Sequence, residues 1–420
     1  MDIAITGMGT ISPLGTTVDD LYDGLLAGQI GIGIAPWATS VEEGLYAAVH
    51  DRFDPTASMD PRVVAGTDGF ARFAIAACAE ALNDAGLDPD SLDPFTTGVV
   101  HGTSMGGHFT VARAQHQLER NGVDATDRKT QIKIWPNMAA AQICLAYGLH
   151  GPSITVTTAC ASSLDALNTA ALYLRAGLAD VVLVGATEGG YTADDGDHFL
   201  PAFVAGERAY GMSSGQTDPH RAMLPFDVDR VGIVSGEGSA FFVLETAEHA
   251  AARGARIRGW FGGGASLADA HHPSSPEPEG RWEQLVMERA QAAANVSPDQ
   301  IDVMIAHATG TPKGDQAEIR AINRVFDTSQ RVVATGLKGN TGHTGASSGA
   351  MSIIAGIRAM ETGKLAAIAG TNVVDPEANF DVAVHRPRAM DVGVFQVNSF
   401  GFGGQNASVI ISREANHAGS

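Results

Sequence analysis

The pattern of hydrophobic and polar positions changes its period close to Cys160. Residues 153–158, SITVTT, have the composition of a short buried strand. From Ser162 the apolar residues recur at steps of three and four between Leu164 and Leu174, which is the spacing of one helix face. Cys160 lies where the strand gives way to the helix, a position compatible with a small core residue or with a nucleophile.

Strand and helix patterns alternate along most of the chain, which indicates an α/β protein with mostly parallel sheets. The alternation contains an internal echo between residues 160–190 and residues 345–374. Each segment begins near Ala-Ser-Ser, continues as a small-residue amphipathic helix and ends in a strand that runs to Gly-Ala-Thr or Gly-Thr-Asn. Chance similarity of two helix–strand units is the alternative, but the matching order of parts favours a duplicated chain.

A duplication would divide the chain into two halves of similar fold. A strand-rich run, SGEGSAFFVLET, closes the first half, and we therefore predict halves at 1–255 and 256–420. Cys160 in the first half and His343 in the second precede corresponding helices. If the halves pack about a pseudo-twofold axis, we expect these two helix starts to face each other.

Composition and charge restrict the partners of the protein. The 420 residues are 44% hydrophobic and 18% charged, as in a soluble globular protein, and no apolar run is long enough to span a membrane. The formal net charge of −20 disfavours nucleic acid or an anionic membrane as the main partner. The N-terminus shows no basic region or cleavage site of a signal peptide, and three scattered cysteines fit a reducing cytoplasm.

Cys160 meets one condition for a nucleophile, because a helix start lowers the pKa of a thiol through its unsatisfied amides and its dipole. We therefore predict a lowered pKa for this thiol. Cys78 and Cys144 lie inside apolar helical patterns and are interpreted as inert packing residues. On this pattern alone, a small core residue is an equal alternative for Cys160.

Two histidines occupy positions that favour chemistry over packing. His307 ends a buried strand and leads into a Gly/Thr loop, which is where α/β sheets place ligands. His343 lies among glycines in TGLKGNTGHTGASSGA, where no amphipathic pattern would bury it, and Lys338 precedes it by five residues. Two imidazoles and a cation around a thiolate would suit acid–base and nucleophilic catalysis. Metal binding is the weaker alternative, because no third ligand appears at a usable spacing.

A glycine-rich segment with two phenylalanines, NSFGFGGQNASVIIS, covers residues 398–412. Its glycines permit tight turns and close approach of the backbone. No lysine follows as in a phosphate-binding loop, so a tight turn before the final strand is the simpler interpretation.

Taken together, these motifs resemble the β-ketoacyl synthases, the condensing enzymes of fatty-acid and polyketide synthesis. The resemblance is carried by TACASS around Cys160, HATGTPKGDQAE from His307, LKGNTGH with Lys338 and His343, and NSFGFGGQN. The order, spacing and local context of these motifs match the family pattern over residues 1–412. The resemblance implies the thiolase fold, a duplicated α/β core of five αβαβα layers, which agrees with the internal repeat.

The resemblance also implies roles for these residues. Cys160 would accept an acyl group from acyl carrier protein as a thioester. A malonyl unit on a second carrier protein would lose CO₂, and its carbanion would attack that thioester. His307 and His343 would stabilise the malonyl enolate. Lys338, paired with Glu318, would provide electrostatic support. No tightly bound cofactor is implied, since the substrates are carried on the 4′-phosphopantetheine arm of the carrier.

Further roles follow from the same resemblance. The backbone amides of Cys160 and Phe402 would form the oxyanion hole for acyl transfer, and Phe402 matches the gating phenylalanine of the family. Thr309 and Thr311 match the threonines that hold the phosphopantetheine arm. Four basic residues are candidates for docking the carrier protein, although each is equally compatible with a solvated surface charge: Arg128, Lys129, Lys133 and Arg208.

Two positions depart from the family pattern. Ala308 follows the first histidine, where the family often has glycine. Ser352 stands where a glutamate is often found, which leaves one inner polar contact in question.

We predict a cytoplasmic, dimeric β-ketoacyl synthase that elongates carrier-bound acyl chains by decarboxylative Claisen condensation. The ACASS motif and the altered segment after His343 favour a dissociated (type II) polyketide pathway, with fatty-acid elongation as the alternative. A CoA-dependent, thiolase-like acyltransferase and a non-catalytic subunit that binds carrier protein are further alternatives. The second chain of the dimer would be an identical copy or a silent sister chain resembling a chain-length factor. No nucleic acid, membrane or metal is expected as a partner.

Overall fold

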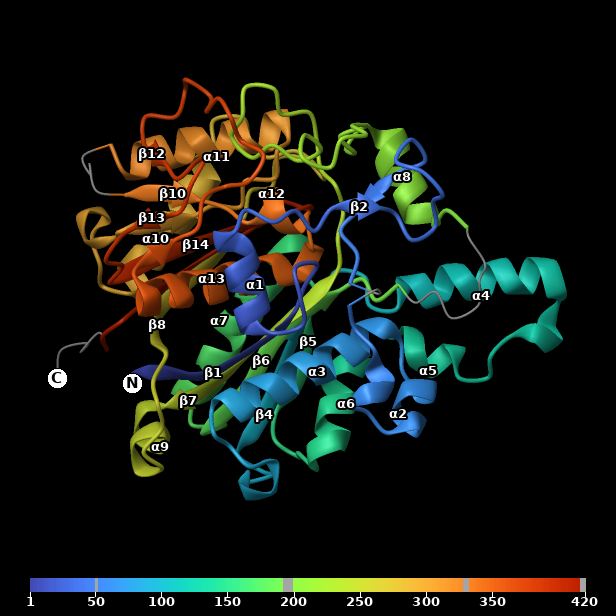
Figure 1. The fold of residues 1–420 in the computed structure, drawn as a ribbon. Coiled ribbons are helices and arrows are strands. Elements are labelled where there is room, and N and C mark those ends of the chain that lie inside the picture. Colours follow the sequence, from blue (N-terminus) through green and yellow to red (C-terminus); the bar gives the residue numbers. More distant parts are fainter. Residues whose placement is uncertain (50–51, 192–198, 328–331, 416–420) are drawn as a thin grey trace.

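One continuous sheet runs through the computed structural model, which describes residues 1–49, 52–191, 199–327 and 332–415 (Figure 1). The strands lie in the order β12-β10-β9-β14-β15-β8-β1-β7-β6-β4-β5. The strands of the first half are β1 (Ile3–Ile11), β4 (Thr97–Gly102), β5 (Ser153–Val156), β6 (Val181–Glu188) and β7 (Gly238–Thr246). The strands of the second half are β8 (Gly259–Ala268), β9 (Val303–Ile305), β10 (Val333–Thr335), β12 (Asp381–Val382), β14 (Val394–Gly401) and β15 (Gln405–Ser412).

The two halves of the sheet repeat the same strand directions. In the first half β1 and β6 each pair antiparallel with β7, whereas β4 pairs parallel with both β6 and β5. In the second half β8 and β14 each pair antiparallel with β15, whereas β9 pairs parallel with both β14 and β10. A short antiparallel contact between β1 and β8 joins the halves. The duplicated topology predicted from the internal echo is therefore observed.

The expectation of mostly parallel sheets is wrong for part of each half. Strand β15 follows β14 after only a three-residue turn, and two strands joined by so short a turn must run antiparallel. Strand β7 occupies the corresponding place in the first half and pairs antiparallel with both of its neighbours.

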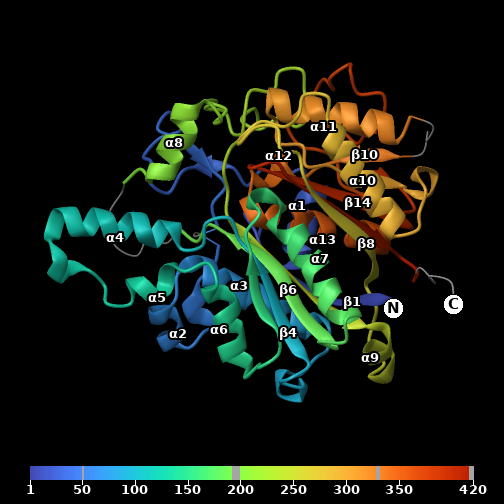
Figure 2. The same cartoon turned by 180° about the vertical axis from the view of Figure 1, so that it is seen from behind.

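Helices separate and cover the two half-sheets to give five layers (Figures 1 and 2). The outer layer on the first half contains α3 (Gly69–Asp84) and α6 (Met138–Tyr147). The central layer contains α7 (Ser162–Arg175) and α13 (Ser348–Thr362), which contact each other. The outer layer on the second half contains α10 (Arg281–Ala293) and α11 (Pro312–Val325). The predicted five-layer α/β core is confirmed.

The two central helices are rich in small residues because sheets cover them on both sides. A β-carbon at Gly349 of α13 would lie 2.6–2.7 Å from the hydroxyls of Ser399 and Ser163, so only glycine fits there. Short 3₁₀ turns precede both helices, η4 (Ala159–Ala161) before α7 and η6 (Gly345–Ser347) before α13, and these turns contact each other. The two helix starts therefore meet, as the duplication predicts.

The remaining elements are peripheral or short. Helix α4 projects away from the layered core in both views (Figures 1 and 2). In the described part of the chain, no helix combines the length and the apolar character needed to cross a membrane. The other helices are α1 (Val18–Leu26), α2 (Pro61–Gly66), α4 (His108–Asn121), α5 (Thr130–Ile134), α8 (Ala202–Tyr210), α9 (Ala247–Ala252) and α12 (Lys338–Thr341). The other strands are β2 (Gly33–Ile34), β3 (Leu45–Tyr46), β11 (Lys364–Leu365) and β13 (Arg388–Ala389).

Candidate active site

Cys160 lies in the 3₁₀ turn η4, between the end of β5 and the first residue of α7. The turn is tight enough that the preceding residue, Ala159, adopts a left-handed φ of 50°. A left-handed conformation at a residue other than glycine costs free energy and is found preferentially at functional sites. The predicted position of the cysteine at a strand–helix joint is confirmed.

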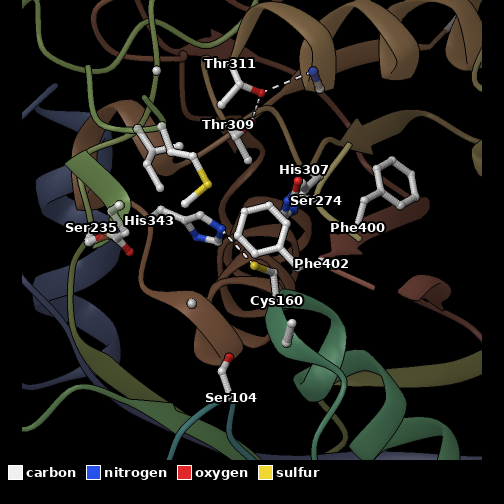
Figure 3. Close-up of a pocket in the computed structure, with 18 of the residues that line it drawn as sticks. Ser104, Cys160, Ser235, Ser274, His307, Thr309, Thr311, His343, Phe400 and Phe402 are labelled. Atoms are coloured by element: carbon white, nitrogen blue, oxygen red, sulfur yellow. Dashed lines mark hydrogen bonds between the residues drawn. The ribbon is translucent and has the colours of Figure 1, made fainter. Parts of the chain in front are cut away.

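His343 contacts the sulfur of Cys160 from the opposite half of the chain (Figure 3). Its Nε2 lies 3.1 Å from the Cys160 Sγ, and its Nδ1 lies 3.2 Å from the Ser348 hydroxyl. Backbone hydrogen bonds fix the residue: its amide donates to the Val234 carbonyl at 2.7 Å, and its carbonyl accepts from the Gly236 amide at 2.9 Å.

His307 follows β9, and Glu318 of α11 holds the backbone at this point. The two carboxylate oxygens of Glu318 accept the amides of His307 and Ala308 at 2.8 and 2.7 Å. Ala308 adopts a φ of 39°, which explains why glycine would be the easier residue here. The His307 ring centre lies 5.4 Å from that of His343, so the two imidazoles face the same space.

Lys338 is buried beside His307. Its ammonium donates to the backbone carbonyl of His307 and lies 3.4 Å from the Nδ1 of that residue. The described residues include no direct Lys338–Glu318 ion pair, and the Glu318 oxygens accept backbone amides, so the expected pairing acts as a coulombic interaction between the two buried groups. Burial lowers the pKa of Lys338, while the charge of Glu318 opposes this shift from a distance.

Burial dominates the electrostatics of the site. It raises the pKa of the Cys160 thiol to about 11, although the charge of Lys338 lowers it, and it lowers the pKa of His343 to about 3. The pKa of His307 is likewise well below its usual value. The predicted lowering of the thiol pKa is therefore wrong, because loss of solvation outweighs the effect of the helix start. At neutral pH the resting pair is a thiol and a neutral imidazole.

A cavity of about 750 Å³ is lined by residues of both halves, among them Cys160, His307 and His343. Phe402 lines it from the turn between β14 and β15, and 47% of this residue is exposed (Figure 3). A β-carbon at the neighbouring Gly401 would lie 3.1 Å from the Cys160 amide nitrogen, so glycine lets the turn approach the nucleophile closely. Thr309 and Thr311 also line the cavity, and their hydroxyls lie 2.9 Å apart.

Comparison with known proteins agrees with this geometry. The N-terminal domain of the β-ketoacyl synthases matches residues 1–250, and the C-terminal domain of the same family matches residues 257–372. The chain belongs to the β-ketoacyl synthase family. This confirms the resemblance drawn from the sequence and makes the protein an acyltransferase of the condensing type.

Individual relatives of the synthase cover almost its whole length. It is 32% identical to 3-oxoacyl-(acyl-carrier-protein) synthase 2 of Synechocystis sp. over 414 residues, or 98% of both chains. It is 34% identical to 3-oxoacyl-(acyl-carrier-protein) synthase I, chloroplastic, of Arabidopsis thaliana over 98% of this chain and 86% of the relative. Among solved structures, the ishigamide ketosynthase/chain length factor superposes with a TM-score of 0.89 at 28% identity, covering 98% of this chain and 99% of that one.

Three possible metal ligands converge in the synthase. One donor atom each from Cys160, His307 and His343 lies within 4.8 Å of the others. A third donor is therefore available in the folded chain, contrary to the expectation from the spacing along the sequence. The three residues that carry these donor atoms also line the cavity.

The four candidate docking residues lie together only in part. Arg128 and Lys129 are exposed just before α5, and Lys133 within α5 forms an ion pair with Asp127 at 2.8 Å. Arg208 lies on α8 and donates to the carbonyl of Glu43. Their role in docking stays a prediction.

Two residues of the synthase site were not singled out from the sequence. Ser348 contacts His343, and its place in the ASSG segment after that histidine is the sequence signal that could have identified it. Glu188 accepts the amides of Ser104 and Ala346 at 2.9 and 3.3 Å and so links the two halves. For Glu188, the only sequence signal of a functional role was an acidic residue at the end of a mostly apolar strand. Ser352, where the family often has glutamate, is buried in α13.

Proposed function

We propose that the protein elongates acyl chains on acyl carrier protein by decarboxylative condensation with malonyl-acyl carrier protein. The observation that supports this most directly is the contact between Cys160 and His343, with His307 facing the same space. The relatives are named 3-oxoacyl-(acyl-carrier-protein) synthases, which supports carrier-bound rather than free substrates.

In the first half-reaction, the Cys160 sulfur attacks the carbonyl of the carrier-bound thioester. The bond from Cys160 to the acyl carbon forms, and the bond to the pantetheine sulfur breaks. The thiol proton passes through the Nε2 of His343, at 3.1 Å, to the leaving thiolate. The amides of Cys160 and Phe402 stabilise the tetrahedral oxyanion, and the close approach of Gly401 to the Cys160 amide supports this assignment.

In the second half-reaction, the malonyl thioester loses CO₂ and becomes an enolate. Its carbon attacks the acyl-Cys160 carbonyl, the carbon–sulfur bond breaks, and the Cys160 thiolate takes up a proton from solvent through the Nε2 of His343. Lys338 can only donate, so its contact makes the Nδ1 of His307 an acceptor and leaves the Nε2–H to stabilise the enolate oxygen. No tightly bound cofactor is needed for these steps.

His343 must change its hydrogen-bonding role between the two steps, and Ser348 suits that change. When the thiol donates to Nε2, the Nδ1–H donates to the Ser348 hydroxyl. Once the sulfur is acylated and the thiol proton has left with pantetheine, the neutral imidazole can adopt its other tautomer, in which Nε2 is protonated and Nδ1 is not. The same hydroxyl can then donate to Nδ1, because a serine is both donor and acceptor.

We also propose that Thr309 and Thr311, which line the cavity, bind the phosphopantetheine arm.

We further propose a cytoplasmic, type II polyketide role over fatty-acid elongation. The ACASS motif and the altered segment after His343 support it, as does the likeness to a ketosynthase/chain length factor structure. Fatty-acid elongation stays the alternative, because the curated relatives are 3-oxoacyl-(acyl-carrier-protein) synthases.

A condensation assay tests the proposed reaction. With acyl- and malonyl-acyl carrier protein, we expect a β-ketoacyl product on the carrier and one CO₂ per product, measured by mass spectrometry. With free CoA thioesters at the same concentration, we expect a rate at least about tenfold lower, since carrier contacts are lost. Equal rates with CoA would support the thiolase-like alternative. A preference for β-ketoacyl over saturated acyl donors would support the polyketide role.

We also propose that the edge of the sheet at β5 pairs two chains. Strand β5 is the last strand in the sheet order, and exposed apolar residues lie on it and on the adjacent helices α6 and α7: Ile154, Leu145 and Leu172. An open strand edge with exposed apolar neighbours is a ready surface for strand pairing. The second chain is an identical copy or a chain-length-factor-like sister.

Introducing a charge at this edge is expected to separate a homodimer. Leu172→Glu should raise the dimer dissociation constant at least about 100-fold, because it buries an unpaired carboxylate in the interface. Light scattering after size exclusion measures the mass. The matched control is Val373→Glu, another exposed apolar residue in the second half. A monomeric wild type at micromolar concentration would contradict the homodimer and leave the heterodimer.

A further inference from the structure

Helix α10 presents a stripe of three residues, Glu283, Met287 and Gln291, at intervals of four residues. This stripe faces β14 and β15, and its inner positions are well partnered. Gln291 donates to the Gln396 side chain at 2.9 Å, which in turn donates to the Ser408 hydroxyl at 2.8 Å. At this end of the stripe the buried polar side chains therefore satisfy one another.

The outermost position of the stripe is different. Glu283 is only 3% exposed, yet its Oε2 has no hydrogen-bond partner. Asn406 lies on the same face of β15 as Ser408, is 4% exposed, and its Nδ2 has no partner either. Both residues line the 750 Å³ cavity. Buried polar atoms without partners are costly, and Glu283 and Asn406 are two such residues that also line the cavity, where a ligand could satisfy them.

The charge state of Glu283 restricts that ligand. Burial and the neighbouring carboxylates of Glu318, Asp269 and Asp315 raise the pKa of Glu283 well above its usual value. This shift favours the neutral carboxylic acid, which offers one O–H donor and a carbonyl acceptor. In the described part of the chain, Glu283 belongs to no convergent group of metal-type ligands. A neutral ligand with both a donor and an acceptor fits better than a cation.

Glu283 belongs to the side of the cavity assigned to the phosphopantetheine arm. Asp315, which influences its pKa, accepts the Gly310 amide at 3.0 Å, and Gly310 lies between Thr309 and Thr311. Both threonines line the cavity together with Phe402 and Ser274 (Figure 3). The arm contains two secondary amides, each with one C=O acceptor and one N–H donor.

We propose that Glu283 and Asn406 bind an amide of the phosphopantetheine arm and position the thioester for attack by Cys160. The Asn406 amide donates to the carbonyl oxygen, and the Glu283 carboxyl group binds the N–H. This rests on the proposed function, and it makes both residues positioning residues rather than catalytic ones.

The test compares three thioester donors of the same acyl group, which differ in the number of amides. These are the pantetheine thioester with two, the N-acetylcysteamine thioester with one and the ethanethiol thioester with none. Acylation of Cys160 is followed by intact mass for wild type, Glu283→Leu, Asn406→Leu and the control Glu283→Gln. For each leucine variant we expect KM for the pantetheine donor to rise about 3- to 10-fold, as for one lost hydrogen bond. The Gln variant keeps a donor and an acceptor and should stay within about twofold of wild type.

The donor series distinguishes recognition from a structural role. With the ethanethiol donor, all four proteins should react equally, and the number of amides at which the penalty disappears identifies the amide. The proposal would be overturned if the leucine variants raised KM equally for all three donors, or if they raised it for none. Melting temperature provides a second readout, since Glu283→Leu removes an unpartnered buried carboxyl and should not lower it.

Failure of this inference and failure of the proposed function are separable. If wild-type protein is acylated but Glu283→Leu behaves like it with every donor, only the inference is wrong. If wild type accepts no donor, the proposed function is wrong, and calorimetric binding of pantetheine itself decides the inference. Weaker pantetheine binding by Glu283→Leu, with Glu283→Gln unchanged, would support it, whereas equal binding would overturn it.

Discussion

Replacing Cys160 with alanine is expected to abolish covalent loading. After incubation with acyl-acyl carrier protein, intact-mass spectrometry should show one added acyl group on wild type and none on Cys160→Ala. Condensation should fall by at least about 10³-fold, because no other group replaces a missing nucleophile. The fold should persist, since alanine fits a 3₁₀ turn flanked by Ala159 and Ala161.

The other cysteines provide the control for this experiment. Cys144 is half-buried, contacts the Ser153 hydroxyl at 3.5 Å and lies outside the cavity lining. Cys144→Ala should therefore load like wild type. Cys78 is fully buried, and burial raises the pKa of its thiol, which makes it unreactive. A mass gain that survives in Cys160→Ala would contradict the assignment of the nucleophile.

Replacing His343 with alanine is expected to slow loading by about 10²–10⁴-fold at neutral pH and to change its pH dependence. In wild type the thiol is protonated below its pKa of about 11, and the imidazole is neutral above its pKa of about 3. Both partners are thus in the reactive form across this range, and the loading rate should be nearly flat between pH 6 and 9.

The sign of the pH effect in the variant follows from the thiol alone. Without His343 only the thiolate reacts, and for a pKa of about 11 its fraction is roughly 10⁻³ at pH 8 and rises about tenfold per pH unit. Single-turnover loading of His343→Ala should therefore accelerate steeply with pH. His116→Ala is the control, because this histidine lies on α4 and bonds Arg120 at 3.3 Å. A flat profile in His343→Ala would show that His343 does not take the thiol proton.

Many elements and site residues of this protein could be predicted from the order of residues along the chain. The strand–helix joint at Cys160, the echo between the halves and the histidine at the end of β9 all follow from short-range preferences of the backbone and from hydrophobic periodicity. The correspondence of Cys160 and His343 also followed, because a repeated order of elements folds into a repeated arrangement in space.

Tertiary structure decided what depends on distant segments and on burial. Cys160 and His343 are 183 residues apart, so the sulfur–imidazole contact and the convergence of three donor atoms require the folded halves. The pKa of Cys160 rises instead of falling because packing removes the water that would solvate a thiolate. Glu318 hydrogen-bonds backbone amides and acts on Lys338 through its charge, and Glu283, which lines the cavity, is left with an unpartnered oxygen. The local sequence pattern thus determined which residues belong to the site. Exclusion of solvent by the two packed halves determined the charge states of these residues and their hydrogen-bond partners.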